Sequence, residues 1–372
     1  MSEALTSRAK DISFIVFDEL NAPFRVPLSS FIHNEVLNSS IKNFNSSNLK
    51  TSSYTEETKN GLLRIEFKEI RFNNPYDNFN PLQEALIEQS QAFSYSSDQN
   101  NFYLSSGMAF DLHGGLKSNE YLQHNHSLKA LIANPWAGFT EKGLSFGRSF
   151  FYKNYSIDAF NSIGKNKKLD PFANSSSSNH TVMFDVSNPS KTISFQYGIL
   201  KEKDGVNGLT GSGIFNTHKN SYTKFSGISF FRETSLGLFV GSIHEGNNPG
   251  RNNNGVFSNF SKAKSQAYSF GFQPILKSYH KLVFSISQPL KVTRGFVDLE
   301  LPSQRTKNKE LLFSNHRIDL SSSSTEINSK ISYEHSSSIG RFGAIIGYKE
   351  NPYHSDFFDD YWYASLTYSK SY

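Results

Sequence analysis

The feature that most constrains this chain is the alternation of apolar and small polar residues along segments of about ten residues. Between residues 192 and 200, small or polar side chains separate the apolar ones, which are Ile193, Phe195, Tyr197 and Ile199. Residues 281–287 and 361–372 repeat the pattern. Because successive side chains of a strand point to opposite faces, this period indicates strands with one apolar and one polar face.

Composition narrows the classes that such strands can build. The chain has 34 Phe and 18 Tyr among 372 residues, yet its hydrophobic fraction is only 37% and its mean hydropathy is −0.49. A chain with 15% aromatic residues is not generally disordered, and it lacks the roughly 18 consecutive apolar residues of a membrane-spanning helix. Without cysteine, the chain forms neither a disulfide framework nor a thiolate site. The net charge of +5 is too small and scattered to indicate a nucleic-acid partner.

Strands joined by polar turns predict an all-β fold, a transmembrane antiparallel up-and-down β-barrel of about 12 strands counted from about residue 93. A sheet in lipid must close on itself, because lipid cannot satisfy its free backbone groups. The aromatic residues would then face lipid and the small polar ones the lumen. A soluble β-sandwich or β-helix is the alternative. The clearest predicted strands are residues 181–187, 192–200, 222–232 and 236–244. Further strands are predicted at residues 63–72, 266–276, 280–292, 294–301, 317–334, 341–350 and 361–372.

The strongest helix signal is at residues 80–91, where Asn80 can cap the helix, Pro81 takes its first position and Gln83 completes a capping box. This helix would lie either on the surface or inside the barrel lumen. Residues 38–60 are rich in Ser and Asn and predict a linker. We therefore expect an irregular passenger remnant or linker over residues 1–79, and a lumen helix with a barrel over residues 80–372.

The C-terminal segment resembles the closing strand of outer-membrane barrels, which commonly ends on an aromatic residue. Tyr372 is that residue here, and Leu366 and Tyr368 continue the apolar face. Lys370 departs from the pattern, since an apolar residue is usual there. We expect Leu366, Tyr368 and Tyr372 to form a membrane-assembly signal.

Residues 194–215 and 284–301 are two segments whose sequences resemble the C-terminal barrel of subtilisin-like serine peptidases of the autotransporter type. The resemblance covers most of the chain and is strongest from about residue 180 to 350. Its landmark residues are Glu202, Gly208, Gly211, Ser212, Gly213, Phe215, Gln288, Pro289, Leu290 and residues 299–302.

The resemblance implies a translocator in the outer membrane of a Gram-negative bacterium, which anchors and exports a passenger. It further implies a monomer without cofactor or metal, whose partners are membrane lipid, the barrel-assembly machinery and a possible passenger domain. The peptidase motifs of that family are missing, and residues 143–147, which match G-x-S-x-G, precede a strand pattern rather than the helix of a nucleophile elbow. We therefore predict no catalytic activity.

The first residues lack the layout of an export signal, and we interpret the chain as the C-terminal piece of a longer gene. A passive outer-membrane pore and a soluble β-rich binding or adhesion domain are the alternative functions.

Overall fold

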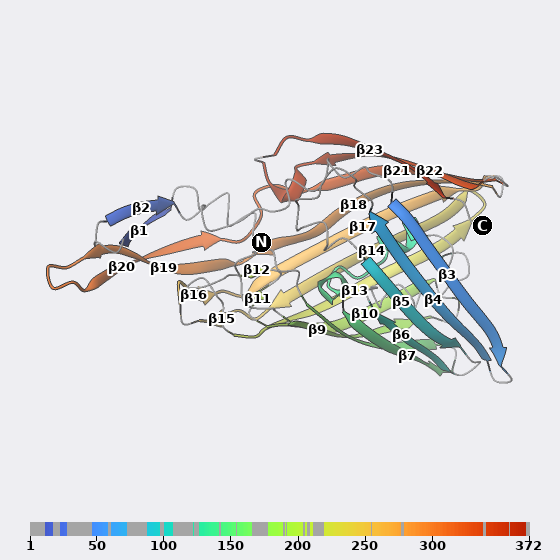
Figure 1. The fold of residues 1–372 in the computed structure, drawn as a ribbon, viewed down its shortest axis with the longest axis horizontal. Coiled ribbons are helices and arrows are strands. Elements are labelled where there is room, and N and C mark those ends of the chain that lie inside the picture. The colour runs from blue at the N-terminus through green and yellow to red at the C-terminus, as the bar shows by residue number, and fades with distance from the viewer. Residues whose placement is uncertain are drawn as a thin grey trace.

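A computed structural model gives the fold of the chain (Figure 1). It describes residues 12–17, 23–27, 47–58, 61–72, 88–96, 100–106, 122, 126–140, 143–153, 155–165, 178–188, 190, 192–203, 205–206, 209–210, 219–253, 255–276, 279–337, 340–356 and 358–369.

One 15-stranded antiparallel sheet makes up most of the described chain, in the order β23-β22-β21-β18-β17-β14-β13-β10-β9-β8-β7-β6-β5-β4-β3. Figure 1 shows it curving from β3 round to β23. Its strands are β3 (Ser47–Thr58), β4 (Gly61–Phe72), β5 (Glu88–Ser96), β6 (Asn100–Ser106), β7 (Leu144–Tyr152), β8 (Tyr155–Lys165), β9 (Ser178–Ser187), β10 (Ile193–Glu202), β13 (Ser221–Thr234), β14 (Gly237–Asn248), β17 (Ala263–Pro274), β18 (His280–Arg294), β21 (Ile327–Ser337), β22 (Gly340–Glu350) and β23 (Tyr361–Ser369).

The predicted up-and-down β class is confirmed. Within this sheet, each strand pairs with the strand before it and the strand after it in the chain, once the short strands of the other sheets are set aside. From β6 onward, this sheet contains twelve strands, which is the number expected from about residue 93. The sheet also includes β3, β4 and β5, which precede them.

Two local predictions before residue 97 are wrong. Residues 47–58 form β3 rather than a linker, because a full ladder with β4, from Ser47↔Phe72 to Thr58↔Gly61, outweighs the loop preference of Ser and Asn. Residues 88–91 of the expected helix belong to β5, which pairs with β4 from Ile70↔Glu88 onward. Residues 80–87 lie outside the described residues.

The two faces of the sheet are clearest in β10. Ser194 and Gln196 are buried on one side, whereas Phe195 and Tyr197 are 57% and 51% exposed on the other. Strands β7, β13 and β17 alternate in the same way. A continuous exposed apolar surface indicates contact with lipid rather than water. The predicted orientation of the aromatic residues is therefore confirmed, and the alternative of a sandwich that buries them between two sheets is wrong.

Connections between neighbouring strands alternate between short and long along the whole sheet. Residues 153–154 and 235–236 are short connections at one end, while residues 107–143 and 295–326 are long connections at the other. Outer-membrane barrels place short turns on the periplasmic side and longer loops outside. We call these ends the short-turn end and the long-loop end.

A separate lobe, which we call the end lobe, continues from the long-loop end of β18 (Figure 1). Its four-stranded sheet has the order β15-β16-β19-β20, formed by β15 (Arg251–Asn252), β16 (Phe257–Phe260), β19 (Phe296–Arg305) and β20 (Leu311–Asp319). The pair β1 (Ser13–Phe17) and β2 (Pro23–Pro27) contacts β19, and Ile12 packs against the lobe's apolar core. A short pair, β11 (Gly205–Val206) and β12 (Leu209–Thr210), lies at the same end.

The predicted single strand over residues 317–334 is split in the structure. Its first part belongs to β20 and pairs with β19, whereas its second part is β21 and pairs with β18. The serine-rich residues 321–324 separate the two strands, because they form bends instead of a ladder.

The described helical elements are short: α3 (His126–Leu131), η6 (Ala137–Thr140) and η8 (Pro352–His354). Across the described ranges, the structure has no helix with the length and apolarity needed to cross a membrane.

Candidate functional site: the filled lumen

Residues 126–140, which we call the lumen segment, lie against the inner face of the sheet. They belong to the long connection between β6 and β7 and contain α3 and η6. The segment contacts strands from β8 to β18, since α3 lies beside β14, β17 and β18 while η6 lies beside β8 and β9. A part of the chain therefore occupies the space that the curved sheet surrounds.

Apolar contacts hold α3 in place. Leu128 and Ile132 are fully buried, and they join a cluster with Phe231, Val240 and Val283, whose side chains point inward from β13, β14 and β18. Burial of a leucine or isoleucine side chain stabilises this packing by about 1.5–3 kcal/mol each.

Trp136 is the largest side chain of the segment and is 1% exposed. Its indole stacks on the ring of Phe225, with ring centroids 5.1 Å apart and an interplanar angle of 2°. Gly246 of β14 lies behind the indole, where a β-carbon would come within 2.3 Å of Cζ2 of Trp136. Only glycine lets the wall approach the ring so closely.

A chain of hydrogen bonds connects the segment to the wall. The side-chain amide of Asn134 donates to Oε1 of Gln196 at 3.0 Å, and Nε2 of Gln196 donates to the carboxylate of Asp185 at 2.8 Å. The backbone N–H of Trp136 donates to Oδ1 of Asn134 at 3.0 Å. Because all four residues are buried, these bonds replace water that the polar groups would otherwise bind.

Backbone carbonyls of the segment accept further bonds from the wall. The hydroxyls of Ser242 and Ser269 both donate to the carbonyl of Leu131, the first at 2.8 Å. Nδ2 of Asn179 donates to the carbonyl of Phe139 at 2.9 Å. These bonds come from β9, β14 and β17, so the segment is fixed near its middle and near its C-terminal end.

The wall beneath the segment is polar and contains buried ionisable groups. Asp158, Asp185, Glu202 and His244 are all at most 1% exposed, and the hydroxyl of Ser149 donates to Asp158. Side chains of this kind suit a water-filled conduit. Here they are shielded from solvent, so this part of the lumen is filled.

The sequence did not point to the lumen segment. We expected a lumen helix at residues 80–91, whereas the structure places residues 126–140 inside. The available signal was the spacing of Leu128, Leu131 and Ile132 on one helical face, followed by Trp136.

The predicted assembly residues lie on β23. Leu366 and Tyr368 are 83% and 55% exposed on the lipid-facing side, and the ring of Tyr368 lies 4.8 Å from that of Phe342. Tyr372 lies outside the described residues. Their role in membrane assembly stays a prediction.

The landmark residues of the autotransporter resemblance do not meet in one site. Glu202 is fully buried at the long-loop end of β10. The landmarks Gly208, Gly211, Ser212 and Gly213 lie outside the described residues. Gln288, Pro289 and Leu290 lie on β18, where pairing with β21 has ended at Ser287↔Asn328.

Pro289 has no N–H and cannot donate to a ladder, which fits the end of pairing at this position. His354 of η8 lies near the backbone of Pro289 and Leu290, and its Nδ1 accepts from the backbone N–H of Glu326 at 2.9 Å. Burial, with the positive charge of Lys291, lowers the pKa of His354 to about 4. The landmark thus marks the point where a neutral buried histidine joins β18 to β21.

The G-x-S-x-G match is part of a barrel strand, as predicted. Ser145 is 1% exposed within β7, and its hydroxyl lies 2.7 Å from that of Ser162 on β8. A nucleophile elbow would instead expose the serine on a turn before a helix.

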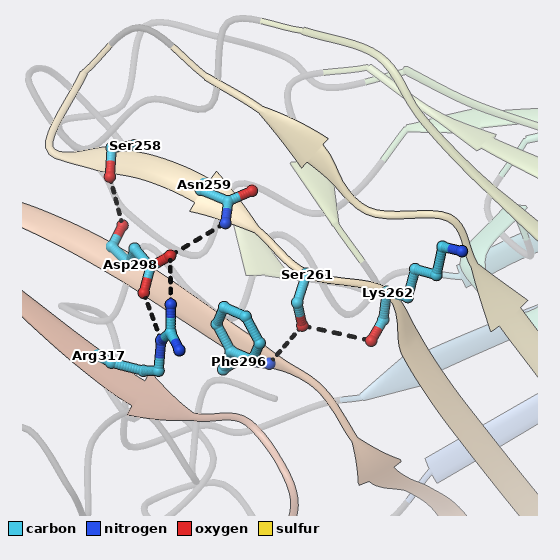
Figure 2. A network of polar contacts seen from close by, with 7 residues as sticks. All are labelled: Ser258, Asn259, Ser261, Lys262, Phe296, Asp298 and Arg317. Carbon is cyan, nitrogen blue, oxygen red and sulfur yellow. Dashed lines mark hydrogen bonds and ion pairs between the residues drawn. The ribbon is translucent and has the colours of Figure 1, made fainter.

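The end lobe is held by the polar network in Figure 2. Arg317 donates through Nε and a terminal nitrogen to Asp298 at 2.7 and 3.2 Å, and Nδ2 of Asn259 donates to the same carboxylate at 3.0 Å. The guanidinium carbon of Arg317 also lies 3.9 Å from the ring centre of Phe296. The bonds from Arg317 hold the pKa of Asp298 below its usual range. The network joins β16, β19 and β20.

Comparison with known proteins identifies no family for the chain. No protein-family model and no curated sequence matches the chain. A loop-deletion mutant of OmpT, an outer membrane protein of Vibrio cholerae, is similar in structure at 8% identity and a TM-score of 0.42, covering 91% of this chain and 90% of that chain. In-vitro folded OmpT of Vibrio cholerae is similar at 9% identity and a TM-score of 0.36, over 82% and 85%. A mutant of the Rh. blastica porin follows at 9% identity and a TM-score of 0.33, over 80% and 83%.

The alternating faces, the up-and-down order and the alternating connection lengths together define a transmembrane β-barrel. The autotransporter resemblance remains a prediction, because no family model matches.

Proposed function

We propose that the chain is an outer-membrane anchor barrel of the translocator type. It holds its N-terminal part at the outer surface, while its own lumen segment closes the barrel. In this proposal the chain is a monomer in membrane lipid, is inserted by the barrel-assembly machinery and catalyses no reaction.

The filled lumen is the observation that carries the proposal. A passive pore requires inward side chains that contact water along a continuous path. Here Asp185, Gln196 and His244 are at most 3% exposed, and Trp136 is buried among them. An anchor has no need of a permanent path, so the filled part of the lumen favours anchoring over free diffusion.

The position of the first strands supports the same function. The pair β1–β2 contacts β19 in the end lobe, which continues from the long-loop end of β18. Long loops face outward in outer-membrane barrels. A passenger joined ahead of Ile12 would therefore be displayed outside the cell, as the autotransporter resemblance implies.

An accessibility experiment tests this arrangement. The full chain is exported behind a secretion signal in a Gram-negative host, with an epitope tag either before Ile12 or in the short turn at Ser235–Leu236. On intact cells, antibody should label the first tag, and it should label the second only after the outer membrane is permeabilised. Labelling of the turn tag alone on intact cells would refute the proposal.

A gated channel is the second candidate, and the polar wall beneath the lumen segment favours it. Ser149, Asp158 and Gln196 would line a hydrophilic path if the segment moved. Planar-bilayer recording separates the two functions. A channel opens frequently in the intact chain, whereas an anchor conducts only when the lumen segment is displaced or when residues 126–140 are deleted.

A further inference from the structure

Four neighbouring strands carry a row of nitrogen-bearing side chains on one face. The register pairs Lys224 of β13 with Asn247 of β14, Asn247 with Lys264 of β17, and Lys264 with Arg294 of β18. All four residues are exposed. With strands about 4.8 Å apart, the two lysine backbones are separated by about 10 Å, and Arg294 lies one strand further. We call these residues the cationic row.

The cationic row is on the lipid-facing side. The residues that follow Lys224 and Lys264 in the chain are Phe225 and Ser265, which are buried on the lumen side. Because side chains alternate along a strand, Lys224 and Lys264 face outward. The pairing of β17 with β18 shifts in register between Lys264 and Ser265, so Arg294 belongs to the row through its pairing with Lys264 and its exposure.

The row lies at the edge, nearest the long-loop end, of the exposed apolar side chains on the outer face, which we call the apolar belt. Ile228 lies four residues from Lys224, on the side of the short-turn end. It pairs with the exposed Ile243, which in turn pairs with the exposed Tyr268. This spacing is about 13 Å along the strand. On β13, β14 and β17 the exposed apolar side chains thus begin below the row, whereas on β10 the exposed Ile199 pairs with Lys224 itself. The row therefore lies at the edge of the apolar surface, where acyl chains give way to headgroups.

The positive charges of the row are not neutralised by neighbouring carboxylates among the described residues. Among the described residues, no carboxylate lies within ion-pair distance of Lys224, Lys264 or Arg294. The nearest carboxylate in the register is Glu245, which pairs with Ser226 and Gln266 between the row and the belt. Nearer the loops, Nζ of Lys201 lies 5.9 Å from the ring centre of Tyr222, a pairing typical of a membrane interface.

We propose that the cationic row binds the phosphate groups of a phosphorylated lipid in the outer leaflet. The inference rests on the membrane orientation in the proposed function. Arg294 can bind a phosphate through two parallel N–H bonds, while Lys224 and Lys264 supply point charges and the amide of Asn247 a further donor. The row is open on one side, so phosphate alone is held weakly. A lipid binds because its chains contact Ile228 and Tyr268 at the same time.

Native mass spectrometry of the full chain in neutral detergent tests the proposal. Lipid A, a glycolipid with two phosphates, is titrated against the chain, with phosphatidylcholine as the lipid without net charge. We expect the double variant Lys224→Gln/Lys264→Gln to bind lipid A about 30-fold more weakly than the unaltered chain. The matched control is Lys307→Gln/Lys309→Gln, which removes two exposed lysines from the tip of the end lobe. It should bind as the unaltered chain does.

Equal binding by the row variant and the unaltered chain would overturn the proposal, as would equal weakening in the control variant. Competition by inorganic phosphate at concentrations similar to those of lipid A would show a free-phosphate site instead of a lipid site. Heat-dependent mobility in SDS gels confirms that each variant is folded. Because the titration is done in detergent, a negative result leaves the epitope experiment intact, and the two proposals fail separately.

Discussion

Substitution of Gly246 by alanine is the sharpest test of the lumen segment as the closure of the barrel. The new β-carbon would lie 2.3 Å from Cζ2 and 2.9 Å from Cε2 of Trp136. The indole is 1% exposed and stacked on Phe225, so it has no free space to rotate into. Overpacking of this kind costs about 1–3 kcal/mol.

The cost falls mainly on the lumen segment, because β14 is held by ladders to β13 and β17 on both sides. At about 2 kcal/mol, the population with a displaced segment rises about 30-fold. Planar-bilayer recording should show correspondingly more frequent opening for Gly246→Ala than for the unaltered chain.

Gly241→Ala is the matched control on the same strand. Its β-carbon would meet Cε1 of Phe230 at 2.4 Å, but this ring is exposed to lipid and can turn away. The control should leave conductance unchanged. If both variants open equally often, or if Gly246→Ala lowers the melting temperature without opening the barrel, the lumen segment is not the closure.

Three further predictions concern other parts of the molecule. Burial lowers the pKa of His354 from 6.5 to about 4, so between these two pH values only the unfolded state binds a proton at this histidine. The free energy of unfolding, measured in urea, should therefore drop by up to about 3 kcal/mol as the pH falls from 6.5 to 4. The variant His354→Gln should show a weaker dependence on pH. Leu366→Arg places a charge on the lipid face and should destabilise the barrel by about 2–4 kcal/mol near the bilayer centre, which lowers the yield of heat-modifiable barrel. Ser365→Asn, on the other face, should leave that yield unchanged. Equal losses of yield in the two variants would contradict the assignment of faces. Arg317→Gln should raise the pKa of Asp298 toward its ordinary value in a carboxyl-carbon NMR titration, and an unchanged pKa would refute the role of this pair.

The alternation of residues along each strand was sufficient to predict which face meets lipid. Phe195 and Tyr197 alternate with Ser194 and Gln196, and the sheet keeps that division, because a strand cannot turn one side chain without turning its neighbours. The limits of the strands were less well predicted, because the expected strand over residues 317–334 is interrupted at the serine-rich residues 321–324.

The segment that fills the barrel and the first strand of the sheet could not be predicted from local sequence patterns, because both depend on long-range contacts. Residues 126–140 enter the lumen because Phe231, Val240 and Gln196 offer apolar and polar contacts from strands distant in the chain, and no local pattern encodes those contacts. Strand β3 has weak local preference for a strand and forms because β4 supplies a complete ladder. Local periodicity determines the direction of a side chain, whereas occupancy of a lumen depends on a sum of long-range contacts that exists only after the sheet has curved.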